Sequence, residues 1–483
     1  MALNGFNRNI KLLDMISDEE IENIHFATLD ILKKTGVKFE SKWALDFFKK
    51  NDCIVSFSDM SVRFPEGLVE ECLKKVPSKF KIKAREEKND LFLGGNNVYF
   101  YDAPGRETID LNTFIPHNPS KLEYINYIKV LDALPNLHKL SAYPYFGFEN
   151  IPEVMIIPEI VALKLIYSSK VQDTPYFNDS EIFTVKMAKV AGIEFLDGIH
   201  SLSPLFIDKR SITRARRTIE AGFPVYIANG CSLGVTSPAT VAGSIVVGNS
   251  EIIAMIVFMQ LMKPGTRIHV WDVSIPTNMK NGLPYFGQIQ DSINKAIFNQ
   301  IWRKKYKIPI ANGSTGFSNA KNIGFQLGYE KTMSCIISAL SGANLIMLHG
   351  GIYGELTAHP VQAVLDDDIA GMIGQFLEGV SINDETIALN LIEKIGQFPG
   401  NYLNTEHTRQ WWKKEQYITK AGNSLSYPEW LSEGKKNELN SAKEISEEII
   451  NNHKPLLLEE EKIEEIKKIL EEAKKYYKEK GML

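Results

Sequence analysis

Short apolar runs alternate with helix-like segments from about residue 137 to residue 370. Segments with helical spacing of apolar positions separate the runs, and several pass into the next run through Gly or Pro, as in AGFPVYIANG and SGANLIMLHGG. Seven runs predict buried strands, and an eighth would close a ring: 139–145, 174–178, 199–206, 224–231, 267–273, 308–312, 344–349 and 357–364. This repeat is typical of a TIM (β/α)8 barrel. A doubly wound sheet is the alternative, but no GxGxxG pattern joins a strand to a helix.

The pattern divides the chain into three parts. Residues 1–135 predict an α+β accessory region of three helices and a small meander that includes 97–102. Residues 136–370 form the predicted barrel, and residues 371–483 a helical extension that packs on the barrel or on a partner. The most apolar run, 244–262, is interrupted by polar residues and predicts a buried barrel helix, not a membrane span.

Composition narrows the classes of protein. With 483 residues, 44% of them hydrophobic and 24% charged, the chain can build one large soluble barrel and an accessory region. A net charge of -4 provides no broad basic field, which argues against a nucleic-acid partner. The polar N-terminus lacks the apolar core of a signal peptide. Four cysteines without CxxC spacing suit a reducing cytoplasm: Cys53, Cys72, Cys231 and Cys335.

The segment 307–368 is where we expect the active site, because two predicted strands there are each followed by Gly-rich and polar residues. Ligand groups of parallel α/β folds gather past the carboxyl ends of strands. A metal site is not predicted, since neither HxH nor HExxH occurs. Asp366, Asp367 and Asp368 instead predict the cap of a helix that begins at Ile369.

Ten short segments follow the order found in the trimethylamine methyltransferase family, which the chain resembles over nearly its whole length. They are TLDILKKTGV, FPEGLVEECLKKVPSKFKIKAR, LDALPN, GVTSPATVAG, QLMKPGTRI, FQLGYEK, ALSGANLI, VLDDDIAGMIGQFLEG, HTRQWWKKE and WLSEG. The resemblance implies a TIM barrel that passes a methyl group from an N-methylated small molecule to the cobalt of a separate, cognate corrinoid protein. The corrinoid (cobalamin) would be carried by that partner, and assembly into a homo-oligomer stays open.

Pyrrolysine, which the founding trimethylamine enzymes of this family carry in the barrel, is absent from this sequence. Relatives without it resemble demethylases of quaternary amines such as glycine betaine, carnitine or proline betaine. Five residues match the family pattern in the pyrrolysine region: Lys321, Gln326, Gly328, Tyr329 and Glu330. Three depart from it: Asn319, Ala320 and Gly324. Alternatives are a tertiary amine, an O- or S-methyl donor, or a non-catalytic relative that binds a ligand.

A quaternary ammonium leaves as a neutral amine, so the protein has only to orient it, exclude water and stabilise its charge. Aromatic faces do this well. Trp271 and Tyr176 are the leading candidates among the aromatic residues near predicted strand ends: Tyr143, Tyr145, Phe146, Tyr176, Phe177, Trp271, Tyr285, Phe286, Phe317 and Tyr353. A substrate carboxylate would need polar partners, and the candidates for binding or positioning are His349, Asn229, Asn312 and Gln326.

Overall fold

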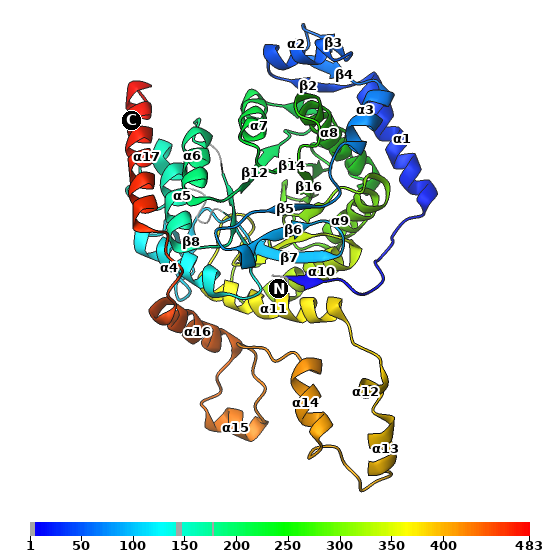
Figure 1. Ribbon diagram of the computed structural model, residues 1–483, viewed down its shortest axis with the longest axis vertical. Coiled ribbons are helices and arrows are strands. Elements are labelled where there is room, and N and C mark those ends of the chain that lie inside the picture. Colours follow the sequence, from blue (N-terminus) through cyan, green and yellow to red (C-terminus); the bar gives the residue numbers. More distant parts are fainter. Residues whose placement is uncertain (1–4, 142–146, 176–177) are drawn as a thin grey trace.

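The computed structural model describes residues 5–141, 147–175 and 178–483. Within these residues, eight parallel strands form a closed barrel, because the last strand pairs with the first (Figure 1). In order around the ring they are β7 (Asn97–Asp102), β10 (Lys139–Leu140), β11 (Val171–Thr174), β12 (Phe195–His200), β14 (Val225–Asn229), β16 (Ile268–Asp272), β19 (Ile310–Asn312) and β20 (Leu345–His349). The predicted TIM barrel is confirmed, and each of the seven strands predicted up to residue 349 overlaps an observed one.

A helix follows each barrel strand along the described chain and covers the outside of the ring. These helices are α4 (Lys121–Ala133), α5 (Ile156–Tyr167), α6 (Glu181–Ala191), α7 (Lys209–Ala221), α8 (Val241–Met262), α9 (Ile289–Ile301), α10 (Phe325–Ser341) and α11 (Pro360–Glu378). The loops at the carboxyl ends of the strands carry short pairs of strands, including β8 (Thr108–Ile109) with β9 (Pro116–His117) and β17 (Ile275–Asn278) with β18 (Leu283–Pro284).

The eighth strand predicted at 357–364 is wrong, because α11 begins at Pro360. Its place is taken by β7, which lies in the predicted accessory meander. Tyr99 and Tyr101 of β7 pack in the barrel interior, whereas Val98 and Phe100 pack against the surrounding helices. A strand buried on both faces is typical of a parallel barrel and not of a surface meander.

The predicted helix start at Ile369 is also wrong. The side chain of His359 caps α11, and Asp366, Asp367 and Asp368 lie buried within the helix. Each carboxylate has a partner that its local sequence does not reveal. For example, Asp366 forms an ion pair of 2.6 Å with the buried Lys331 of α10. Buried acids are therefore satisfied here by tertiary contacts instead of by helix capping.

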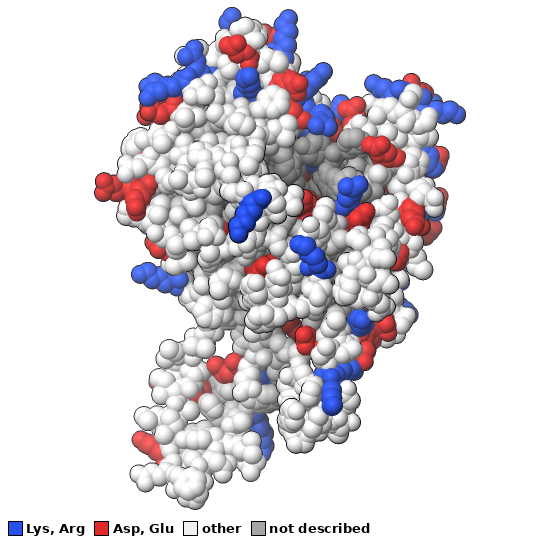
Figure 2. Space-filling model, turned by 180° about the vertical axis from the view of Figure 1, so that it is seen from behind, with Lys and Arg blue, Asp and Glu red and all other residues white. Residues whose placement is uncertain are grey.

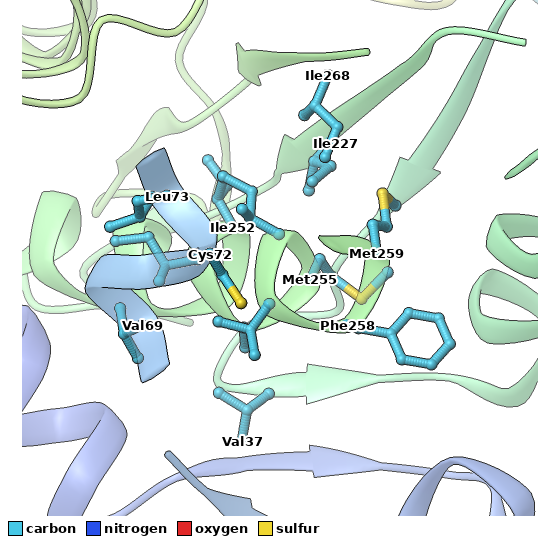
Figure 3. Packing of buried hydrophobic residues seen from close by; sticks show 14 of the residues in the cluster. Val37, Val69, Cys72, Leu73, Ile227, Ile252, Met255, Phe258, Met259 and Ile268 are labelled. Atoms are coloured by element: carbon cyan, nitrogen blue, oxygen red, sulfur yellow. The ribbon is translucent and has the colours of Figure 1, made fainter. Parts of the chain in front are cut away.

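The accessory region packs against the barrel through α8 (Figure 3). One side of α8 packs against Ile227 of β14 and Ile268 of β16, and another side packs against Val69 and Cys72 of α3. Among the described helices, α8 alone is long and apolar enough to cross a membrane, but 72% of its most apolar stretch is buried. The prediction of a buried barrel helix is confirmed. The accessory elements are α1 (Asp18–Lys34), β2 (Val37–Phe39), α2 (Lys42–Lys50), β3 (Ile54–Ser56), β4 (Ser61–Arg63) and α3 (Glu66–Lys74).

A hairpin closes the end of the barrel at which the strands begin. It consists of β5 (Phe80–Ile82) and β6 (Leu91–Leu93), and its apolar residues share one cluster with the interior residues Tyr99, Val171 and Leu345. The backbone around the hairpin also bonds to residues that precede barrel strands, as in the 3.0 Å bond from Glu194 N–H to the Lys83 carbonyl. The lumen is therefore closed at the end where the strands begin.

The C-terminal extension has two different parts. Helices α16 (Glu438–Asn452) and α17 (Glu460–Glu479) pack on the barrel helices α11, α4, α6 and α5. Helices α12 (Asp384–Ile387), α13 (Leu389–Ile395), α14 (Glu406–Glu415) and α15 (Tyr427–Ser432) contain no buried residue and project from the body (Figure 1). This projection is mostly uncharged in Figure 2, whereas charges of both signs mix over the rest of that face.

Candidate active site

Four rings from four strands meet at one level of the barrel lumen. Tyr226 of β14 and Trp271 of β16 are perpendicular, with ring centroids 4.6 Å apart. Tyr101 of β7 lies 6.2 Å from Trp271. His200, at the end of β12, lies 5.6 Å from Tyr226 and 5.8 Å from Trp271. We call these four residues the ring cluster. Trp271 is only partly buried, so the cluster is accessible from the end where the strands finish.

Two glycines make space for the ring cluster. A Cβ at Gly198 of β12 would lie 1.8 Å from Tyr226 Cζ, and one at Gly313 would lie 2.5 Å from Trp271 Nε1. Real side chains do not approach so closely, so only glycine allows these two rings to occupy their positions. The ring cluster therefore depends on the two glycines that leave space for it as well as on its aromatic residues.

A buried ion pair lies beside the ring cluster. Lys139 of β10 pairs with Asp173 of β11, and Ser141 Oγ is 3.1 Å from both Lys139 Nζ and the Asp173 carboxylate. The same Nζ lies 4.2 Å from the centre of the Tyr101 ring. The Tyr101 hydroxyl donates to the Asn312 carbonyl at 3.3 Å. Tyr101 thus already has a cation of the protein itself on its ring.

The histidine of the cluster is partly buried and neutral. Desolvation, followed by the nearby Arg214, lowers the pKa of His200 to about 4. The imidazole is therefore uncharged at neutral pH, and its Nε2 lies 3.4 Å from the Tyr226 hydroxyl. A neutral imidazole does not repel a cationic ligand, and it fixes the orientation of the neighbouring phenol.

Asp102, at the end of β7, is a buried acid with an unusual environment. One carboxylate oxygen accepts a 2.5 Å bond from the Ser141 N–H, and the other has no hydrogen-bond partner among the described residues. Burial raises the pKa of Asp102 to about 7, although the backbone bond opposes this. The group can thus exist in either protonation state near neutral pH.

Three polar residues predicted at the site face the helices instead of the lumen. Asn229 packs against Gly248 of α8; its amide oxygen accepts a 3.2 Å bond from the Ser274 hydroxyl, and its amide nitrogen donates to the Asp272 carboxylate at 3.0 Å. Asn312 exchanges side-chain bonds of 2.8 and 3.0 Å with Asn299 of α9. His349 is fully buried, with Nε2 3.6 Å from the Asp367 carboxylate of α11. These contacts join strands to helices, and a role of the three residues in ligand binding stays a prediction.

Other predicted residues gather in the loops above the barrel. Phe286 and Phe317 meet edge to face at 5.3 Å. Phe286 and Tyr353 line a 340 Å³ cavity that also includes Asn319 and Lys321. The Lys321 ammonium lies 4.2 Å from the centre of the Tyr353 ring. The Tyr353 ring thus already contacts a cation of the protein itself.

Gln326 acts on this loop through another residue. It donates to Glu330 at 2.8 Å, and Glu330 accepts a 3.0 Å bond from the Asn319 N–H. The Asn319 side chain in turn donates to the Phe286 carbonyl at 2.8 Å. Asn319, one of the departures from the family pattern, therefore joins two loops above the lumen.

Five of the predicted aromatic residues lie outside the described residues: Tyr143, Tyr145, Phe146, Tyr176 and Phe177. The sequence reasoning missed Tyr101, Tyr226 and His200, which share the lumen with Trp271. A signal for the two tyrosines was present, because each lies in an apolar strand that is buried on both faces. No group of three or more His, Cys, Asp or Glu residues in the described chain could hold a metal ion.

The chain is similar to known methyltransferases over most of its length. The model of the family described as trimethylamine methyltransferase (MTTB) matches residues 1–477. Glycine betaine methyltransferase of Desulfitobacterium hafniense (strain Y51) is 28% identical over 439 residues, which cover 87% of this chain and 89% of that protein. Trimethylamine methyltransferase MttB of Desulfitobacterium hafniense (strain DSM 10664 / DCB-2) is 28% identical over 478 residues, covering 95% and 94%.

One solved structure supports the fold alone. A crystal structure of a hydroxylamine complex of MtmB aligns with a TM-score of 0.52 at 11% sequence identity. The alignment covers 98% of this chain and 90% of that one. The shared architecture is the barrel with its surrounding helices.

Proposed function

Because the chain belongs to the trimethylamine methyltransferase family, whose members methylate corrinoid proteins, we propose that it demethylates a quaternary amine. The methyl donor would resemble glycine betaine, and the acceptor would be the Co(I) of a cognate corrinoid protein in the cytoplasm. The two relatives named above share the same 28% identity with the chain but differ in substrate. The ring cluster, and not sequence identity, therefore carries the choice of a quaternary amine.

The proposed step is a methyl transfer without proton transfer. The C–N bond breaks with both electrons going to nitrogen, which leaves as a neutral tertiary amine. The electron pair of Co(I) forms the new bond to the methyl carbon. No general acid is needed, so the protein contributes orientation, exclusion of water and stabilisation of the cation.

The ring cluster meets these requirements. Trp271 and Tyr226 offer perpendicular aromatic surfaces, and each such surface contributes about 0.5–2 kcal/mol to binding of a quaternary ammonium. His200 is neutral and adds no repulsive charge. The strands that carry these residues end at the open end of the barrel, where a corrinoid protein would bring its cobalt.

The assay mixes the purified protein, reduced cob(I)alamin and a panel of methyl donors, and follows the absorbance of methylcobalamin. Glycine betaine, carnitine and proline betaine represent quaternary amines; trimethylamine represents tertiary amines; methoxy and thiomethyl compounds complete the panel. We expect methylation from one or more quaternary donors only. Methylation by tertiary amines alone would refute the proposed substrate class, and methylation by no donor would refute the catalytic proposal.

Trp271→Ala tests the ring cluster itself. The variant should bind the quaternary substrate at least several-fold more weakly, since it loses one aromatic surface. Trp412→Ala is the matched control, because Trp412 is a partly exposed residue of α14 on the projection. An unchanged affinity in Trp271→Ala would remove this residue from the site.

A further inference from the structure

A second cavity lies at the opposite end of the barrel. It has a volume of 300 Å³, and all four charged residues that line it are basic: Arg8, Lys79, Arg303 and Lys307. Its other lining residues include the segments that precede β7, β19 and β20, three neighbouring strands. We propose that this cavity binds a phosphate group, either as inorganic phosphate or as part of a small phosphomonoester.

The surroundings of Arg8 are the strongest evidence that this cavity binds an anion. Its side chain is 2% exposed, and one guanidinium nitrogen donates to the Ala343 carbonyl at 2.6 Å. The Nε atom has no hydrogen-bond partner among the described residues. A buried cation normally has an anionic partner, because removal of a charge from water is costly. Here the protein supplies a second cation nearby instead of a carboxylate.

The charge balance around the cavity stays positive. Arg303 forms an ion pair with Asp14, which neutralises one of the four basic groups. In the described part of the chain, no carboxylate forms an ion pair with Arg8, Lys79 or Lys307. Burial, followed by repulsion from Arg303, lowers the pKa of Arg8 to about 10, so the guanidinium remains charged at neutral pH. Three positive charges are thus available to one ligand.

The backbone is shaped to keep these groups together. Gly342 has a φ of +123°, and a Cβ there would lie 2.7 Å from Arg303 Cδ. Gly94 and Gly95, with φ of +104° and +62°, lie against the Lys79 side chain: a Cβ at either position would lie 3.0 Å from one of its carbon atoms. Each of these conformations favours glycine, which leaves room for the basic side chains and for a ligand.

Phosphate is the ligand chemistry that suits this arrangement. A guanidinium provides several N–H donors in a fixed plane, and two flexible ammonium groups add point charges, which together match a tetrahedral oxyanion. The volume admits a phosphate with a small organic group attached. The cavity lies where the strands begin, beside the ends of the closing hairpin, whereas the ring cluster lies toward the end where the strands finish. The proposal is therefore independent of the methyl-transfer proposal.

Equilibrium dialysis of the full chain with radiolabelled phosphate tests the proposal, at fixed ionic strength set by chloride. Glycerol phosphate, added as a competitor, distinguishes the two sources: stronger displacement than by unlabelled phosphate indicates a phosphomonoester site. We expect saturable binding, accompanied by a phosphate-dependent increase in melting temperature. No saturable binding of either probe would overturn the proposal.

Variants locate the bound phosphate. Lys79→Gln with Lys307→Gln changes two exposed side chains, so the protein should fold, and affinity should fall at least tenfold because two charge-assisted contacts are lost. Arg8→Met should abolish binding if it folds. Lys280→Gln with Lys394→Gln is the control, since both lysines are exposed and form no ion pair within the described residues. Unchanged affinity in the Lys79 and Lys307 double variant would overturn the site.

Discussion

Gly198→Ala places one methyl group in the ring cluster without removal of any aromatic residue. The new Cβ would lie 1.8 Å from Tyr226 Cζ and 2.0 Å from the Tyr226 hydroxyl oxygen. Neither β12 nor β14 can move far, because the two strands pair from Asp197 to His200. The Tyr226 ring must therefore tilt away, and its perpendicular contact with Trp271 at 4.6 Å must change.

The magnitude follows from two effects. Overpacking of a close-packed interior costs about 1–3 kcal/mol of unfolding free energy. Displacement of one or two aromatic faces costs a bound quaternary ammonium about 0.5–2 kcal/mol per face, so the dissociation constant should increase between about twofold and about a thousandfold.

Urea unfolding measures the first effect, and titration calorimetry with the best quaternary donor measures the second. Gly67→Ala is the matched control, since Gly67 is an exposed residue of helix α3 with no atom within 4 Å of its potential Cβ. The control should be more stable than the wild type by about 1 kcal/mol and should bind the donor normally. Normal donor binding by Gly198→Ala would show that the position of Tyr226 does not matter for the substrate.

Three more predictions concern stability. Folding raises the pKa of Asp102 to about 7, from about 3.8 in the unfolded chain, so ionisation of this group makes the folded protein less stable as pH rises between these two values. Asparagine does not ionise, so Asp102→Asn should add up to about 4 kcal/mol to the unfolding free energy at pH 8 and little near pH 4. Unchanged stability at pH 8 would contradict the energetic cost of ionising this buried carboxyl group, which has one oxygen without a hydrogen bond among the described residues. The pKa values of His200 and His269 fall to about 4 and about 3, so wild-type stability should decrease as pH falls below 6.5, more steeply than in a His269→Phe variant, and equal slopes in denaturant titrations would contradict this. Phe258→Ala in α8 should cost about 3–5 kcal/mol in urea unfolding, against under 1 kcal/mol for the exposed Phe92→Ala, and similar costs would contradict the packing in Figure 3.

The sequence predicts barrel strands best where both faces are apolar. The strands at Val225, Ile268 and Leu345 begin within one residue of the predicted positions. By contrast, β11 and β12 begin three and four residues earlier than predicted, because they contain buried acids. Asp173 pairs with Lys139 and Asp197 with Arg214, and neither partner is visible from the local pattern. Tertiary ion pairs allow polar residues to occupy strands that a hydrophobic pattern rejects.

The candidate site was predicted by position along the strands but not by direction. Trp271 faces the lumen, whereas the next residue, Asp272, bonds to Asn294 of α9. Asn229 and Asn312 likewise occupy the helix-facing positions of their strands. Because successive side chains of a strand point to opposite faces, an error of one residue moves a candidate from the lumen-facing side of the strand to the helix-facing side. A position at the end of a strand does not tell which of the last two residues faces the lumen, since both lie at the strand end.

The pairing of β7 with β20 has a consequence for synthesis of the protein. The 242 residues between Asp102 and Leu345 must be translated before the ring can close. At about 5–20 residues per second, this interval lasts roughly 12–50 seconds. During that time the first strand lacks its final neighbour, and a nascent chain has an open sheet edge. The N-terminal hundred residues are thus no removable appendage: a shortened protein that begins after Asp102 would lack one strand of its ring.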